Sequence, residues 1–159
     1  MSETVIRLAA PADQPAMEAV INAAFAVETF IEGTRTDPQH LAAMMQQGKF
    51  LLAFDPSGEL VGSVYVEVNS SRGYFGMLAV NPAKQGTGIG RILVHAAEDY
   101  CREHGCQVMD ISVLSLRPEL PPLYRKLGYT ETGKEEFHPR RPLKPGFECH
   151  SIVMSKPLL

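Results

Sequence analysis

One hexapeptide, QGTGIG at residues 85–90, limits what this chain can fold into more than any other stretch. The apolar run before it, residues 74–80, predicts a strand buried on both faces, and the Asn-Pro pair at 81–82 ends that strand. Apolar residues at helical spacing follow over 89–101, and Gly105 stands where such a helix should end. The sequence therefore predicts a strand, a glycine turn and a helix in direct succession.

A glycine turn in this position is typical of a phosphate site, because backbone N–H groups can approach a ligand closely at the positive end of a helix. The same arrangement also occurs as plain packing, so the hexapeptide alone leaves both interpretations open. A Walker A loop is excluded because Arg91 follows the last glycine where Lys and Ser or Thr are required. The dinucleotide fingerprint is excluded because Gly86, Gly88 and Gly90 alternate.

Length and composition predict a single globular domain over residues 1–159, with 45% hydrophobic and 21% charged residues. No apolar run reaches the roughly 20 residues of a membrane span, and the first residues do not resemble a signal peptide. The 3 cysteines form no C-x-x-C pair, which favours free thiols in a reducing compartment over a zinc site. A net charge of −3 argues against general nucleic-acid binding. We expect a cytoplasmic protein with no metal, nucleic-acid or membrane partner.

Hydrophobic periodicity and turn residues divide the whole chain into alternating elements. Strands are predicted over 5–8, 50–54, 60–68, 74–80, 107–114, 129–132 and 147–154. Helices are predicted over 11–25, 37–48, 89–104 and 118–127, and a loop over 133–146. A run of hairpins followed by a strand–helix–strand unit predicts an α/β (α+β) fold. We expect a mixed, mostly antiparallel sheet of about seven strands, flanked by about four helices.

Two motifs resemble those of the GCN5-related N-acetyltransferases. Gln85, Gly88 and Gly90 occupy the specified positions of that family's Q/R-x-x-G-x-G/A loop, and the order of elements resembles its fold over essentially the whole chain. The run at 122–129 resembles its L-Y-x-x-x-G-F/Y signature, with Tyr124 as the signature tyrosine. The resemblance implies acetyl-CoA as the cofactor, entering between a splayed fourth and fifth strand. The implied cofactor-binding residues are Leu78, Ala79, Val80, Gln85, Gly86, Thr87, Gly88, Ile89, Gly90 and Arg91.

Direct transfer from a thioester to an amine needs a deprotonated amine, a stabilised oxyanion and a proton for the departing thiolate. The resemblance assigns the last task to Tyr124, since a phenol with a pKa of about 10 is protonated at neutral pH. The alternative is that Tyr124 only packs its short helix beside Leu120 and Leu127. The family often carries Asn where this chain has Arg117, and a small residue where it has Leu120. Some cofactor contacts are therefore absent here or replaced, with Arg117 as the candidate replacement.

The general base is not fixed by the sequence, because Gly76 and Met77 stand where many relatives carry a carboxylate. The remaining candidates are Glu67, Glu28, Glu32, His138 and His150. Glu67 is favoured because a strand position is more rigid than a loop position. A base that acts through water is a further alternative.

The loop over 133–146 is basic, and its charged or titratable residues are Lys134, His138, Arg140, Arg141 and Lys144. It is either a solvated loop or a lip that attracts an anion, such as the carboxylate of an amino-acid-like amine or the 3′-phosphate of CoA.

The sequence as a whole predicts an N-acetyltransferase that moves an acetyl group from acetyl-CoA to the primary amine of a small molecule in a ternary complex. Acetylation of a protein N-terminus or lysine is the alternative among enzymes. A non-catalytic acyl-CoA-binding domain is the alternative outside them. The resemblance also implies a possible homodimer.

Overall fold

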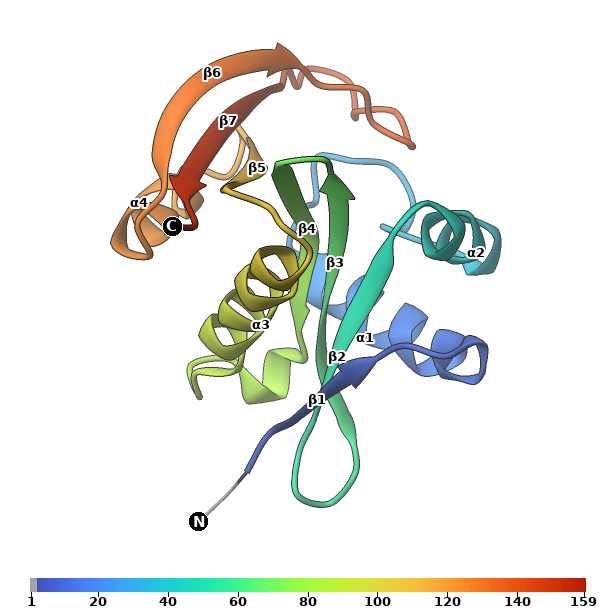
Figure 1. The fold of residues 1–159 in the computed structure, drawn as a ribbon. Coiled ribbons are helices and arrows are strands. Elements are labelled where there is room, and N and C mark those ends of the chain that lie inside the picture. Colours follow the sequence, from blue (N-terminus) through green and yellow to red (C-terminus); the bar gives the residue numbers. More distant parts are fainter. Residues whose placement is uncertain (1–2) are drawn as a thin grey trace.

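The computed structural model describes residues 3–159, and its centre is a seven-stranded sheet in the order β1-β2-β3-β4-β5-β7-β6 (Figure 1). The strands are β1 Val5–Leu8, β2 Lys49–Phe54, β3 Leu60–Asn69, β4 Arg72–Val80, β5 Val108–Leu114, β6 Thr130–Glu136 and β7 His150–Pro157. The α-helices are α1 Gln14–Phe25, α2 Pro38–Gln47, α3 Ile89–Glu103 and α4 Leu120–Lys126. Only β4 and β5 pair in parallel among the strand pairs of the described chain. The predicted mixed, mostly antiparallel sheet with helices is confirmed.

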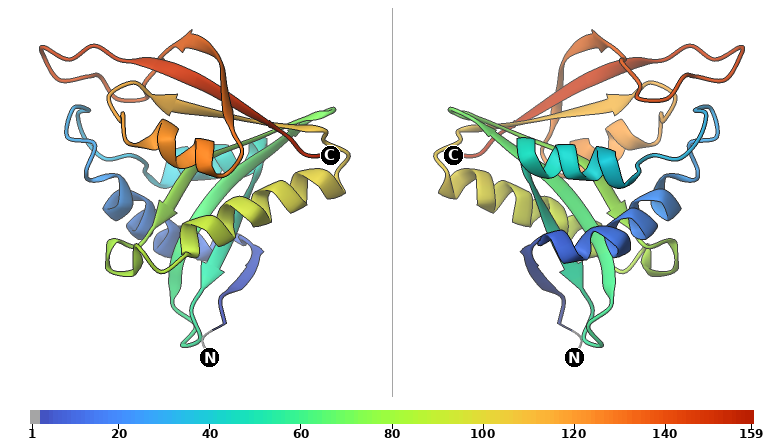
Figure 2. Two further views of the ribbon diagram at one scale, coloured as in Figure 1. Left: turned by 90° about the vertical axis from the view of Figure 1, so that its left-hand side faces the viewer. Right: turned by 90° about the vertical axis from the view of Figure 1, so that its right-hand side faces the viewer.

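Helices cover both faces of the sheet, with α3 on one face and α1 and α2 on the opposite one (Figure 2). Strand β2 shows why both faces are apolar: Leu51 packs in the core beneath α3, while Phe50 and Leu52 pack in the core beneath α1 and α2. This alternation follows from the two-residue period of a strand. No helix in residues 3–159 is both long and apolar enough to span a membrane.

Strands β4 and β5 part soon after they meet. They pair only at Arg72 with Val108, Gly73 with Met109 and Tyr74 with Asp110, although β4 continues to Val80. Beyond that point β5 keeps its pairing with β7 on its other side (Figure 1). The splay that the family resemblance implied is therefore present, and the β5-facing edge of β4 has no strand partner after Tyr74.

A bulge bends β4 in the same region. Ser63 pairs with Ala79 and Tyr65 with Gly76, so one residue of β3 lies opposite two residues of β4. Within the bulge Met77 has a φ of 49°, a left-handed conformation that is uncommon for a residue with a Cβ atom. Met77 is buried, so the surrounding core holds this conformation in place.

Three predicted boundaries are wrong near the C-terminus. Strand β6 continues to Glu136 instead of ending at 132, and β7 runs over His150–Pro157 instead of 147–154. Every residue of β6 is exposed, so it has no apolar alternation for a sequence pattern to detect. Pairing with β7, which reaches from Thr130–Ser155 to Glu136–His150, makes it a strand. The loop between these strands therefore spans 137–149 instead of 133–146, and Lys134 lies on β6.

Two helix starts also differ from the prediction. The first helical segment opens as a 3₁₀ turn over Pro11–Asp13, and α1 itself begins at Gln14. Helix α4 begins at Leu120, two residues later than predicted. In both segments prolines lie at the first helical positions, where a backbone N–H has no intrahelical acceptor and its absence does not destabilise the helix. Because proline is tolerated at several of these positions, the sequence does not determine where the helix starts.

A buried charge fixes α3 to the C-terminal half of the sheet. The carboxylate of Glu98 is 1% exposed and accepts hydrogen bonds from the Tyr129 hydroxyl at 2.7 Å and from Lys156 Nζ at 3.1 Å. Burial and the Glu98 carboxylate both raise the pKa of Tyr129, so the phenol remains a donor. Helix α3 carries the glycine turn at its N-terminus, so these bonds also position that turn.

Substitution of Glu98 by Ala should therefore lower the free energy of unfolding by about 3 kcal/mol, because the buried Tyr129 hydroxyl and the partly buried Lys156 ammonium lose their acceptor. Urea denaturation measures the loss. Asp99→Ala is the matched control, since its side chain is 68% exposed and pairs only with Arg102 among the described residues. An equal loss of stability in both variants would contradict the anchoring role.

Candidate active site

The glycine turn adopts the backbone conformation for which glycine is needed. Gly86 and Gly88 have φ values of 81° and 89°, and Gly88 is the N-cap of α3. A Cβ atom added at either position would meet no protein atom within 4 Å. The left-handed φ therefore selects glycine here, and crowding does not. The space above the turn stays open to a ligand.

Backbone donors are free throughout this turn. None of the N–H groups from 85 to 91 donates to another described residue. Side-chain hydrogen bonds stabilise the turn instead. The Asn81 side chain accepts from the Ala83 N–H at 3.0 Å, and the Thr87 hydroxyl donates to the Lys84 carbonyl. A row of free N–H groups at a helix N-terminus is a binding site for phosphate oxygens.

A cleft of about 460 Å³ runs from this turn between the parted strands, and we refer to it as the β4–β5 cleft. Four of the ten residues predicted to bind the cofactor line it: Leu78, Val80, Gln85 and Gly90. The side chains of Ala79 and Ile89 are buried in the two cores. Arg91 is exposed on α3 and does not line the cleft.

Tyr124 lines the β4–β5 cleft from α4. Its ring is 8% exposed and packs against Phe75 and Tyr129, with centroids 6.0 and 6.1 Å away. Its hydroxyl bonds to no other described residue. Burial raises the pKa of Tyr124 to about 12. The tyrosine therefore packs the helix and also presents a protonated hydroxyl to the cleft.

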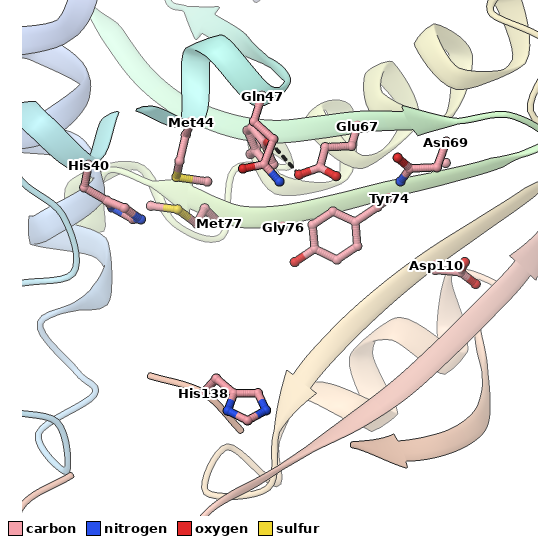
Figure 3. Close-up of a pocket in the computed structure, with 12 residues that line it drawn as sticks. His40, Met44, Gln47, Glu67, Asn69, Tyr74, Gly76, Met77, Asp110 and His138 are labelled. Atoms are coloured by element: carbon pink, nitrogen blue, oxygen red, sulfur yellow. Dashed lines mark hydrogen bonds between the residues drawn. The ribbon is translucent and has the colours of Figure 1, made fainter. Parts of the chain in front are cut away.

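A second cavity of about 700 Å³, here called the β3–β4 cavity, lies on the other side of β4 (Figure 3). Helix α2, strands β3 to β5 and the segment after β6 all contribute to its wall. It adjoins the β4–β5 cleft, because Tyr74, Gly76, Met77 and His138 line both. The bulged part of β4 is thus the partition between the two spaces.

Glu67 lines the β3–β4 cavity opposite Tyr74, its partner in the β3–β4 register. The Tyr65 hydroxyl donates to Glu67 Oε2 at 2.6 Å, and Oε1 accepts no hydrogen bond from the described chain (Figure 3). Tyr65 fixes one carboxylate oxygen and leaves the other directed to the cavity. Burial and this hydrogen bond raise the pKa of Tyr65, so its hydroxyl stays a donor.

Tyr74 is a site residue that the sequence interpretation missed. Its hydroxyl lies over Gly76, where an added Cβ would collide with it. The Tyr74 hydroxyl thus occupies the space that a side chain at position 76 would need. Burial raises the pKa of Tyr74, which keeps the hydroxyl protonated in the partition between the cavities. A signal was available, since residues two apart on a strand share a face and a large residue needs a small neighbour there.

The other candidate bases are placed less favourably. Glu28 is buried, with Oε1 bonded to Arg35 at 2.9 Å and Oε2 to Arg117 at 2.7 Å, so both oxygens are engaged. Glu32 and His150 are exposed and line none of these spaces. His138 lines both spaces and remains a candidate beside Glu67.

Asp110 also borders the β3–β4 cavity, but its charge is compensated. Arg72 donates to both of its oxygens at 2.7 Å, and the Ser155 hydroxyl donates to Oδ1 at 2.7 Å. These partners hold the pKa of Asp110 below its usual value. Across the described residues, no group of three His, Cys, Asp or Glu side chains is arranged to hold a metal ion.

Two loops meet beside these cavities: the α1–α2 loop and the loop between β6 and β7. Ile31 and Leu143 form an antiparallel bridge, flanked by bonds from the Glu32 N–H to the Pro142 carbonyl and from the Lys144 N–H to the Phe30 carbonyl, each 2.9 Å. The basic loop is therefore attached to the rest of the protein along one side. It is not a freely solvated segment.

Arg140 strengthens this connection. Its guanidinium donates to the Thr34 carbonyl and to Asp37 Oδ2, both at 2.8 Å. Asp37 is the N-cap of α2 and also accepts from the His40 N–H at 2.8 Å. The two loops and the start of α2 are thus joined at one carboxylate.

A family model described as an acetyltransferase (GNAT) domain matches residues 12–139. The mycothiol acetyltransferase of Arthrobacter sp. (strain FB24) is 31% identical over an alignment that covers 58% of this chain and 32% of that protein. The aligned part of this chain thus spans about a third of that relative's length.

Solved structures show the same fold. The ribosomal-protein-S18-alanine N-acetyltransferase of Escherichia coli aligns with a TM-score of 0.78 and 18% identity, over 98% of this chain and 94% of that one. A Salmonella typhimurium protein solved with its cofactor acetyl-CoA aligns with a TM-score of 0.75 and 23% identity, over 99% of this chain and 95% of that one.

The position of Glu28 predicts a structural role. Glu28→Ala should lower the free energy of unfolding by about 2 kcal/mol, because Arg35 and Arg117 lose their shared buried acceptor. Glu32→Ala, on the same loop but exposed, should change it by less than about 0.5 kcal/mol. Chemical denaturation of both variants tests this difference, and a neutral Glu28→Ala would contradict it.

Proposed function

This chain belongs to the acetyltransferase (GNAT) domain family, and from that premise we propose that it transfers an acetyl group from acetyl-CoA to the primary amine of a small molecule. The observation that carries the proposal is the pair of adjoining spaces on either side of β4, which Tyr74, Gly76, Met77 and His138 separate. One space suits a long thioester, and the other suits its acceptor.

The cofactor would lie in the β4–β5 cleft. Its pyrophosphate would bind the free N–H groups of Gln85, Gly86, Thr87, Gly88, Ile89 and Gly90, with Arg91 beside them. Its pantetheine arm would run along the edge of β4 at residues 78–80, since that edge lacks a strand partner after Tyr74. A pantetheine arm carries two amides, and unpaired backbone N–H and C=O groups are suitable partners for them.

The acceptor would lie in the β3–β4 cavity and attack the thioester across the bulge of β4. Attack forms the C–N bond, and collapse of the tetrahedral intermediate breaks the C–S bond and releases the CoA thiolate. Backbone N–H groups on the free edge of β4 would stabilise the oxyanion. Tyr124 would give its proton to the thiolate, and its raised pKa keeps that proton available throughout the neutral range.

Glu67 would accept the proton that the amine must lose. Its Oε1 accepts no hydrogen bond from residues 3–159, whereas the Tyr65 hydroxyl donates to Oε2 at 2.6 Å and so fixes the carboxylate. The hydroxyl of Tyr74, over Gly76, would contact the amine between Glu67 and the thioester. The strand register supports this arrangement, since Glu67 and Tyr74 are direct cross-strand partners.

The joined loops favour a small acceptor over a protein. A protein N-terminus or lysine needs an open groove in which an extended segment can lie. Here the bridge between Ile31 and Leu143, with Arg140 beside it, connects the two loops next to the β3–β4 cavity.

Tyr124→Phe tests the enzymatic part of the proposal. The substitution keeps the ring packing but removes the acid, so kcat should fall about 100-fold. The affinity for acetyl-CoA should change less than about twofold, because the hydroxyl acts mainly on the departing thiolate. Steady-state kinetics with a pool of small amines and calorimetry with acetyl-CoA measure the two quantities.

Tyr100→Phe is the control, because Tyr100 lies on α3 and stacks on His104 away from the cleft. An unchanged kcat in Tyr124→Phe would show that Tyr124 is not the general acid. Binding of acetyl-CoA with no transfer to any amine would instead support a non-catalytic acyl-CoA-binding domain.

A further inference from the structure

We propose that the acceptor carries a carboxylate close to its amine, as an amino acid does, and that Arg141 and Arg35 bind this carboxylate at the mouth of the β3–β4 cavity. The inference rests on the proposed function and names the substrate class for the same site. It follows from the distribution of charge along the cavity.

The mouth is a depression of about 230 Å³ whose lining includes Arg35, Arg140, Arg141, His40 and His138. It adjoins the β3–β4 cavity, because both histidines, Tyr74 and two methionines line both spaces. No carboxylate is among the described residues that line the mouth. The side chains that line the mouth are therefore positive or neutral, and the carboxylates behind them, Asp37 and Glu28, are already paired with arginines.

Arg141 has binding capacity that the protein does not use. Its guanidinium donates no hydrogen bond to the described chain, and its nearest carboxylate oxygen, Asp37 Oδ2, is 3.8 Å away. That oxygen already accepts from Arg140 at 2.8 Å. The Arg141 side chain lies beside Gly33, whose φ of 74° favours glycine; a Cβ added there would be at an ordinary contact distance of 3.4 Å from Nε. Arg140 is held by hydrogen bonds, whereas Arg141 has only a long ion pair with Asp37 and keeps its N–H donors for a ligand.

Arg35 is a second guanidinium with unused donors. Its Nη1 bonds to Glu28 at 2.9 Å, but Glu28 also neutralises Arg117. The guanidinium lies over the Phe25 ring at 4.3 Å and is only 29% exposed, so its orientation is fixed before a ligand arrives. Arg35 also lines the β4–β5 cleft, which brings it close to the reaction centre.

The opposite end of the cavity is negative. Glu67 offers a free oxygen there, while Arg72 and Ser155 compensate Asp110. Met44 and Met77 line the stretch between the two ends. A molecule with an ammonium at one end and a carboxylate at the other matches this polarity. An amine without the acid would leave the mouth arginines unused.

The test compares matched acceptors on the full chain saturated with CoA or acetyl-CoA. The panel contains the twenty common α-amino acids, β-alanine and γ-aminobutyrate. Each is paired with the corresponding amine that lacks the carboxylate, and dipeptides are added to the panel. Isothermal calorimetry measures binding, and CoA release measures transfer. The preferred amino acid should exceed its carboxylate-free partner in kcat/KM by at least about tenfold, and its binding should follow the same order.

Arg141→Gln should lower kcat/KM for the amino acid by about tenfold and leave the carboxylate-free amine unchanged. Arg125→Gln is the control, since Arg125 is an exposed α4 residue that pairs with Glu131. Arg141 makes no hydrogen bond to the described chain, so its loss should not affect folding. Arg35→Gln is the second variant and should act in the same direction.

Three results would overturn the inference. The first is an equal kcat/KM for an amino acid and its carboxylate-free amine, and the second is an equal effect of Arg141→Gln on both of these substrates. The third is that Arg141→Gln weakens CoA binding and changes nothing else. Each of these leaves acetyl transfer itself intact. Carboxylate-dependent binding without transfer to any amine would support the carboxylate site at Arg141 and Arg35 and contradict the proposed function. The two claims therefore fail separately.

Discussion

The early separation of β4 from β5 is the constraint on which the rest of the site depends. Three residue pairs join the strands, and after Tyr74 the two diverge while β5 continues beside β7. The divergence leaves one edge of β4 without a partner and creates the cleft that the glycine turn and Tyr124 border. Strong pairing on the far side of each strand makes this opening stable, since β4 keeps β3 and β5 keeps β7.

Within that opening the bulge in β4 determines how the two spaces communicate. Met77 at a φ of 49° bends the strand, and Gly76 accommodates the Tyr74 hydroxyl in place of a side chain of its own. Strained or unusually small residues at a strand bend cost stability, so they persist where the surrounding core fixes them. Here they form the partition between the proposed cofactor and acceptor, which gives the unusual backbone a functional reason.

The sequence predicted what local patterns encode. The glycine turn, the helical spacing of α3 and the alternation within β2 each act over a few residues, and the family resemblance supplied the splay and Tyr124. Two features could not be predicted because they depend on distant contacts. Strand β6 forms through its pairing with β7, and the bridge from Ile31 to Leu143 joins loops about a hundred residues apart. The role of Tyr74 was missed although it depends on a local contact, with Gly76 two residues away.

The most direct test of the account is a thermal-shift series with acetyl-CoA, CoA, ATP and NAD on the wild type, Gly88→Ala and Gly58→Ala. Gly58 has a φ of 88° in an open hairpin turn. Backbone strain should therefore lower the free energy of unfolding by a similar amount in both variants, roughly 1 to 2 kcal/mol. We predict that the two CoA species alone stabilise the wild type and Gly58→Ala by roughly 2.7 kcal/mol at 100 times Kd, and that Gly88→Ala loses this shift. No response to either CoA species, or an unchanged response in Gly88→Ala, would contradict a cofactor site at the glycine turn.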